Sequence, residues 1–140
     1  MSTLANNLIH KGYLKTDVII EAFSEINRAE FVPDRFRVAA SSDIPLSIGH
    51  GQVLPEPSVL SFMMELLRPA RSQNVLIVGF GGGWVITMMS YIVGPGGSVV
   101  AIDTIQDLKE ETQKNIQKYN FVARNDSTEL KLVSGREDIS

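Results

Sequence analysis

The chain has 140 residues, a length typical of one domain, with 44% hydrophobic and 21% charged residues, as in an ordinary folded protein. Its formal net charge of −3 offers no basic surface to nucleic-acid phosphates or to an anionic membrane, so neither partner is expected. The lack of cysteine excludes disulfides, thiolate metal ligands and thiol catalysis.

The N-terminal residues and the longest apolar run favour a cytoplasmic protein. Met1-Ser2-Thr3 begins the chain without the charged-then-apolar pattern of a secretory signal. The mostly apolar run from Trp84 to Val93 is too short to span a bilayer. His10 and His50 lie far apart, so no histidine-based metal site is expected.

Helices and turns are expected in the first half of the chain. Apolar residues at helical spacing predict a helix that begins near Thr16 and ends before Pro33. Prolines and glycines make 41–57 a loop with short extended pieces. Pro57 suits the first turn of a second helix, which Pro69 ends. Four methionines are expected to fill the core: Met63, Met64, Met88 and Met89.

Strands and helices alternate in the second half. The apolar run from Val75 to Val78 has strand length and is expected to be buried on both faces. The following elements are a glycine loop at 79–83, a helix at 84–93, a strand at 98–102, an amphipathic helix at 105–119 and a strand at 130–133. This order predicts parallel pairing with right-handed crossovers.

The glycine loop has the pattern of a nucleotide site. Gly79, Gly81 and Gly83 lie between a strand and a helix, where a backbone without Cβ atoms can approach a ligand. Asp103 ends the next strand, where its carboxylate can accept ribose hydroxyls. Trp84 occupies the third-glycine position of the dinucleotide fingerprint, so the spacing instead fits S-adenosylmethionine. A tight turn without a ligand is the alternative.

Three earlier segments are LIHKGYL (Leu8–Leu14), INRAEFVP (Ile26–Pro33) and IPLSIGHGQ (Ile44–Gln52). They resemble the N-terminal half of the protein-L-isoaspartate O-methyltransferases. The glycine loop, Asp103 and the next helix follow in the family's order, so the resemblance runs from about Leu8 to Gly135. It implies methyl transfer from S-adenosylmethionine to an isoaspartyl carboxylate in damaged proteins. Because that carboxylate is already ionised, positioning would provide most of the catalysis.

The resemblance also implies a fold and a set of site residues. The fold class is α/β, a truncated Rossmann-like methyltransferase with a parallel sheet, helices on both faces and an N-terminal helical extension. Residues 1–73 would form the helical and substrate-loop region, and 74–140 a partial S-adenosylmethionine-binding region. The implied substrate loop comprises Ile48, Gly49, His50, Gly51, Gln52 and Val53. The implied cofactor residues are Gly79, Phe80, Gly81, Gly83, Asp103 and Thr104.

Several residues depart from the family's pattern. Pro55 stands where the family has a serine beside the reacting carboxylate, Glu56 adds a negative charge, and no catalytic residue is assigned. Ile77 replaces an acidic residue of the first strand, and Arg136 replaces the expected adenine partner. Losing two hydrogen bonds to charged groups would weaken cofactor binding by about 10²–10⁴-fold. There are two alternative hypotheses. In the first, the cofactor site is lost and the chain is an inactive binding module that recognises a peptide or partner through residues 49–57. In the second, the chain is a fragment without a function of its own.

Full members of the family continue through further strands beside the first one. The strand from Val75 to Val78 should therefore lie at a sheet edge, and apolar edges tend to pair with other chains. We expect a homo-oligomer, an exchanged strand or a longer natural protein to cover it.

Four single residues have competing interpretations. His50 is equally expected to contact the substrate or to take part in loop packing. For Gln52, a structural role of the side-chain amide is favoured over a role in the site. Trp84 is expected in the core rather than against an adenosyl group. Arg28 is expected to anchor the N-terminal helix through a carboxylate.

Overall fold

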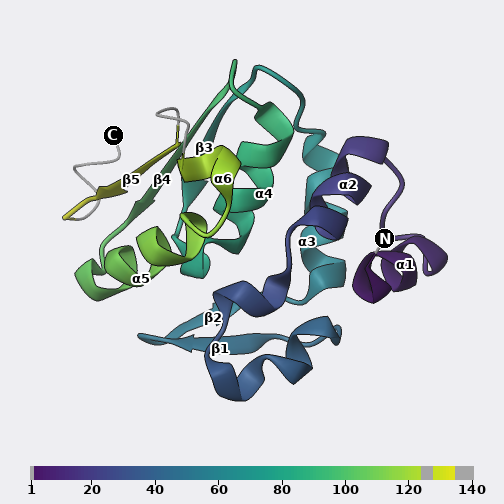
Figure 1. The fold of residues 1–140 in the computed structure, drawn as a ribbon, viewed down its shortest axis with the longest axis horizontal. Helices are drawn as coiled ribbons and strands as arrows, with labels where there is room; N and C mark the ends of the chain where they lie inside the picture. The colour runs from purple at the N-terminus through teal and green to yellow at the C-terminus, as the bar shows by residue number, and fades with distance from the viewer. Residues whose placement is uncertain (1, 124–127, 135–140) are drawn as a thin grey trace.

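The computed structural model describes residues 2–123 and 128–134 (Figure 1). Its first half consists of α1 (Thr3–His10), α2 (Asp17–Glu25), the 3-10 helices η1 (Arg28–Phe31), η2 (Asp34–Phe36) and η3 (Val38–Ser41), the strands β1 (Leu46–Gly49) and β2 (Gln52–Leu54), and α3 (Pro57–Leu67). Its second half consists of β3 (Asn74–Val78), the 3-10 helix η4 (Gly81–Gly83), α4 (Trp84–Val93), β4 (Ser98–Asp103), α5 (Gln106–Ile116), α6 (Asn120–Ala123) and β5 (Thr128–Leu132).

The helix predicted near Thr16 is α2, and α3 begins at Pro57 as expected. Thr16 stands at the N-cap position of α2, but its side chain makes no cap bond and instead donates to the Glu65 carboxylate of α3. Helix α1 was not predicted. The Ser2 hydroxyl caps the N-terminus of α1 by accepting a hydrogen bond from the Ala5 N–H, at 3.1 Å.

The loop predicted at 41–57 contains an antiparallel hairpin. Leu46 pairs with Leu54 and Gly49 with Gln52, with a bulge between Ser47 and Gly49. The tip turns through three residues with positive φ, Gly49, His50 and Gly51. Figure 1 shows this hairpin below the three-stranded sheet, beside the N-terminal 3-10 helices.

The three later strands form a parallel sheet in the order β3-β4-β5. Val75 lies opposite Val99, and Ala101 lies opposite Leu130, so the apolar runs of the sequence are in register. Helix α4 connects β3 to β4, and α5 and α6 connect β4 to β5, so each parallel pair is joined by a helical crossover. The parallel sheet and its flanking helices confirm the expected α/β class.

The N-terminal segment packs onto the second half of the fold. The Asn27 N–H donates to the Tyr119 hydroxyl, at 2.9 Å, and Lys118 Nζ donates to the Glu30 carbonyl, at 3.0 Å. The Phe31 ring stacks on Tyr119 with centroids 5.9 Å apart. These contacts join segments about 90 positions apart in the chain, so the helical extension and the sheet share one core.

Part of the apolar surface is exposed, contrary to expectation. Strand β3 lies at the sheet edge, as predicted, but it is not buried on both faces. Val75 and Ile77 pack against the core, whereas Leu76 is 60% and Val78 is 72% exposed. Met63 was expected in the core but is 58% exposed on α3. Other exposed apolar residues of α3 are Val59, Phe62, Leu66 and Leu67.

Candidate functional site

The loop between β3 and α4 is built from glycines in the left-handed region. Gly79, Gly81, Gly82 and Gly83 have φ values of 99°, 54°, 68° and 106°. Phe80 alone in this loop keeps a right-handed helical conformation. Side chains rarely adopt such positive φ values, which accounts for this run of glycines.

Two of these glycines face open space and two are packed. A Cβ added to Gly79 or Gly81 would meet no heavy atom within 4 Å. A Cβ on Gly83 would lie 2.6 Å from Cγ2 of Ile116, and one on Gly82 would lie 3.0 Å from the Phe31 carbonyl oxygen. The bare backbone is therefore required for internal packing at 82–83, and it borders unfilled space at Gly79 and Gly81.

Asp103 holds the glycine loop against the end of β4. Its Oδ2 accepts the Phe80 N–H at 2.9 Å, and its Oδ1 accepts the Thr104 N–H at 2.7 Å. The Gly79 N–H donates to the Ile102 carbonyl at 2.7 Å. The Phe80 side chain is fully buried, so only its backbone borders the site. A carboxylate can accept about four hydrogen bonds, so Asp103 retains acceptor capacity.

The segment expected to bind substrate lies across from α5. Ile48 is buried and approaches Gly82, whereas the residues from Gly49 to Val53 are exposed. His50 Nε2 lies 3.3 Å from Glu111 Oε1, which brings the hairpin tip to the surface of α5.

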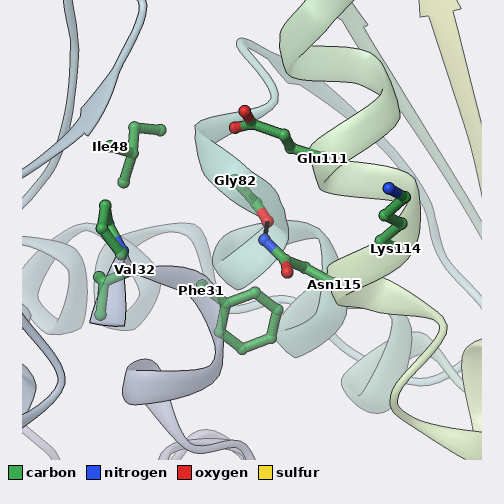
Figure 2. Close-up of a pocket in the computed structure, with 8 residues that line it drawn as sticks. Phe31, Val32, Ile48, Gly82, Glu111, Lys114 and Asn115 are labelled. Atoms are coloured by element: carbon green, nitrogen blue, oxygen red, sulfur yellow. Dashed lines mark hydrogen bonds between the residues drawn. The ribbon is translucent and has the colours of Figure 1, made fainter. Parts of the chain in front are cut away.

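A cavity of about 330 Å³ separates the hairpin from α5. Figure 2 shows Ile48 on one side of this space and Glu111 on the other, with Gly82 between them. Asn115 Nδ2 donates to the Gly82 carbonyl at 3.0 Å and fixes α5 to the loop. The full lining comprises Phe31, Val32, Pro33, Ile48, Gly82, Glu111, Lys114 and Asn115.

The α5 residues of this cavity were missed by the sequence interpretation. Their Lys and Glu pattern is typical of a solvent-exposed helix face, and nothing in it indicates that the hairpin tip lies opposite. The segment Phe31-Val32-Pro33 did carry a signal, because it belongs to the quoted family resemblance.

Arg28 connects the segments on both sides of the hairpin to the start of α4. The expectation that it binds a carboxylate was wrong. Its guanidinium donates to four backbone carbonyls, and it lies 5.2 Å over the Trp84 ring. The acceptors are Ala40 at 3.3 Å, Ser42 at 3.2 Å, and Ile44 and Pro55 at 2.8 Å. Burial lowers the pKa of Arg28 to about 10, while the nearby Asp43 and Glu56 oppose that shift.

The residues that depart from the family's pattern have distinct placements. Pro55 is half-buried and uses its carbonyl to accept from Arg28. Ile77 packs against the core, so an apolar side chain suits its environment. Arg136 lies outside the described residues. Trp84 is in the core, as expected, with its ring edge-on to Phe23 at 5.8 Å.

Among the described residues, no group of three His, Asp or Glu side chains could hold a metal ion. No helix in the same ranges is long and apolar enough to cross a membrane.

Several known proteins similar to this chain are named protein-L-isoaspartate O-methyltransferase. The relative from Ignicoccus hospitalis, a protein-L-isoaspartate O-methyltransferase, is 36% identical over 84% of this chain and 56% of its own length. That from Aeropyrum pernix is 35% identical over 84% of this chain and 45% of its own length. That from Methanococcus aeolicus is 30% identical over 96% of this chain and 60% of its own length. The chain spans about half the length of the curated relatives it matches.

Two solved structures share the fold. A protein-L-isoaspartate O-methyltransferase from Plasmodium falciparum, in complex with S-adenosyl-L-homocysteine, superposes with a TM-score of 0.80 over 95% of this chain and 62% of that chain, at 17% identity. Another protein-L-isoaspartate O-methyltransferase gives a TM-score of 0.71 over 94% of this chain and 41% of that chain, at 23% identity.

The family model for protein-L-isoaspartate(D-aspartate) O-methyltransferase (PCMT) matches residues 1–136, which is nearly the whole sequence. The order of elements, the glycine loop and the hairpin all lie within that match. The chain belongs to the protein-L-isoaspartate(D-aspartate) O-methyltransferase family.

Proposed function

We propose that this chain binds S-adenosylmethionine and contributes to methyl transfer to the carboxylate of isoaspartyl residues in proteins. The observation that carries the proposal is the unfilled space beside Gly79 and Gly81, next to Asp103, in a member of this family. Bound S-adenosylmethionine would supply a sulfonium methyl group that an ionised carboxylate can attack without a strong general base. The Plasmodium falciparum structure, which contains S-adenosyl-L-homocysteine on the same fold, supports this choice of ligand.

The proposed cofactor residues divide into two groups. Gly79 and Gly81 would let the ligand approach the backbone, and Asp103 would accept ribose hydroxyls with its remaining lone pairs. Phe80 and Thr104 would act through their backbone, since their N–H groups already orient the Asp103 carboxylate. Gly83 would support the site indirectly, because its α-carbon faces Ile116.

The hairpin residues from Ile48 to Val53 are the proposed contact for an isoaspartyl peptide. Their exposure leaves backbone and side-chain groups available, apart from the buried Ile48. Pro55 provides no hydroxyl for the reacting carboxylate and has its carbonyl engaged by Arg28. We therefore expect catalysis to depend on positioning by the hairpin rather than on a group at Pro55.

Calorimetric titration with S-adenosyl-L-homocysteine tests the cofactor site. We expect micromolar binding that Asp103→Ala abolishes. Asp107→Ala should leave binding unchanged, because Asp107 is exposed in the first turn of α5 and is not one of the proposed cofactor residues. Methylation of an isoaspartyl peptide by the purified chain is the second assay. Absence of heat up to millimolar ligand, from a folded sample, would contradict the enzyme proposal and favour the inactive binding module.

Two further expectations stay predictions. A homo-oligomer would cover the exposed residues Leu76 and Val78 of the edge strand β3. A cytoplasmic location fits the substrate class that is proposed here.

A further inference from the structure

The outer edge of β3 presents backbone groups of alternate residues. β3 is the end strand in the order β3-β4-β5, so within residues 2–123 and 128–134 only β4 pairs with it. The Gln73 carbonyl and the Gly79 N–H both bond to β4. Because the N–H and C=O groups of alternate residues point to the same side of a strand, the odd-numbered residues from 73 to 79 face β4. The N–H and C=O groups of Asn74, Leu76 and Val78 therefore point to the outer edge.

This edge is complementary to itself. In an antiparallel pair of two copies centred on Leu76, that residue lies opposite its own equivalent, and Asn74 lies opposite Val78 of the other copy. These positions then form the hydrogen-bonded pairs of the ladder, in which opposite residues exchange both of their bonds. Every N–H and C=O group of the outer edge gains a partner in this way. A two-fold axis between the two Leu76 residues generates the arrangement.

The sequence of β3 contains none of the features that normally prevent edge pairing. Native edge strands are commonly protected by charged side chains, proline or a bulge. The segment QNVLIVGF (73–80) has no charged residue and no proline. Its pairing with β4 runs from Asn74 to Val78 without a shift in register, so the strand has no bulge. The outer edge is thus a regular and unprotected template for a further strand.

Exposed apolar side chains concentrate on β3 and α3. In the described ranges, seven of the eleven large apolar side chains that are exposed belong to these two elements: Val59, Phe62, Met63, Leu66, Leu67, Leu76 and Val78. Helix α4 packs on β3 and, together with α3, borders an apolar groove of about 470 Å³. A stable dimer buries roughly 800 Å² per partner, more than a five-residue strand supplies, so the α3 surface has to contribute.

We propose that two copies of this chain join through β3 in antiparallel orientation about Leu76. The three strands of each copy then form one continuous sheet in the order β5-β4-β3-β3-β4-β5. Leu76 contacts its equivalent on one face of the seam. On the other face the α3–α4 grooves of the two copies face each other across the two-fold axis. This inference deepens the proposed homo-oligomer and rests on it, but it does not depend on cofactor binding.

Disulfide cross-linking reports the register directly, because the chain has no cysteine of its own. Leu76→Cys places two thiols at opposite positions of a hydrogen-bonded pair. The Cα atoms of such a pair lie about 5.5 Å apart, within the range that a disulfide spans. Mild oxidation of this variant of the full chain should therefore give a covalent dimer on a non-reducing gel. Leu76 is 60% exposed, so its replacement should not disturb the fold of one copy.

Asn74→Cys and Val78→Cys are matched controls on the same exposed face. Each variant alone should stay uncross-linked, because its two equivalent positions are offset along the strands by about 14 Å. An equal mixture of the two variants should cross-link, because Asn74 of one copy lies opposite Val78 of the other.

Hydrogen exchange tests the pairing without any substitution. The amides of Leu76 and Val78 should exchange at least tenfold more slowly at concentrations where sedimentation shows a dimer than at high dilution. The amides of Val75 and Ile77, which point to β4, should be protected at both concentrations.

Two sets of results would overturn the proposal. A monomer at every concentration would exclude both the homo-oligomer and the strand pairing. A dimer in which Leu76→Cys does not cross-link, or in which Asn74→Cys cross-links to itself, would keep the homo-oligomer and exclude the antiparallel register. Calorimetry with S-adenosyl-L-homocysteine on the same sample decides the cofactor proposal separately.

Discussion

The backbone N–H of Phe80 donates to Oδ2 of Asp103 over 2.9 Å, which ties the glycine loop to the end of β4. The same carboxylate accepts the Thr104 N–H through its other oxygen. Asp103 therefore stabilises the loop in the conformation that borders the open space at Gly79 and Gly81. Changes at this residue should affect both folding and ligand binding.

Replacement of Asp103 by asparagine should lower the free energy of unfolding by about 1–3 kcal/mol, because an amide NH₂ would face the N–H of Phe80 or Thr104. Urea unfolding measures the loss. Asp107→Asn, at the exposed first turn of α5, should cost only about 0.3–1 kcal/mol, through the helix dipole. Equal losses in the two variants would contradict the structural role of Asp103.

Alanine at Gly81 and at Gly83 should separate ligand binding from folding. Gly81→Ala has free space for its Cβ, so its positive φ alone should lower the free energy of unfolding by about 1–2 kcal/mol. The added Cβ should nevertheless reduce binding of S-adenosyl-L-homocysteine. Gly83→Ala would place its Cβ 2.6 Å from Ile116 and should destabilise the fold more. Thermal unfolding and calorimetry on both variants provide the test. A larger loss of stability in Gly81→Ala would be inconsistent with this assignment.

Arg28→Lys should lower the free energy of unfolding by about 2–4 kcal/mol, since an ammonium group cannot reproduce the planar fork that reaches four carbonyls. Chemical denaturation measures this effect. Arg35→Lys is the matched control, because Arg35 is exposed and its one interaction within residues 2–123 and 128–134 is a ring contact with Phe36, worth about 0.5–1 kcal/mol. A loss in Arg28→Lys no larger than in the control would argue against the bridging role.

Glu65 should make stability depend on acidic pH. Burial raises its pKa, but hydrogen bonds from Thr16 and Lys15 outweigh burial and hold the pKa below the ordinary value of 4.5. A carboxyl with a lowered pKa in the folded state stabilises the protein above that ordinary value, and this contribution disappears as the pH falls through the folded pKa.

Below pH 4.5 the unsubstituted chain should therefore lose stability more steeply than Glu65→Gln. Urea unfolding between pH 6 and pH 3 compares the two, with the exposed Glu110→Gln as a control. Parallel pH profiles for Glu65→Gln and the unsubstituted chain would refute the proposed linkage.

The exposed side of β3 should promote self-association. Leu76→Lys and Val78→Lys place charges on an edge strand and should shift sedimentation profiles toward the monomer. Lys131, already charged and exposed on β5, provides the control Lys131→Arg. If the unsubstituted chain is a monomer at every concentration tested, the prediction of a homo-oligomer is wrong.

The sequence predicted the second half of the fold well, because each element there has a local signal. Glycines punctuate the strand-to-helix turn, and Leu108, Thr112 and Ile116 form the buried stripe of α5. The exposure of Leu76 could not be predicted, since an apolar run does not reveal whether a second layer covers the sheet.

The candidate site was predictable in part for the same reason. Gly79, Gly81 and Asp103 follow a recognisable spacing and meet in space. The acceptors of Arg28 were not predictable, because they are four backbone carbonyls from separate turns. Every residue has a backbone carbonyl, so the residue types in the sequence do not mark the ones that accept. The approach of His50 to Glu111 likewise depends on a pairing 61 positions apart.

The hydrogen bond between Asn27 and Tyr119 has a consequence for biosynthesis. At about 5–20 residues per second, a ribosome adds the roughly 90 positions between them in about 5–20 seconds. Throughout that interval Phe31 lacks the aromatic ring on which it stacks. Helix α2 packs on α3 and α4, which are synthesised earlier, whereas the contacts of Asn27 and Phe31 with Tyr119 can form only after α5 has been synthesised.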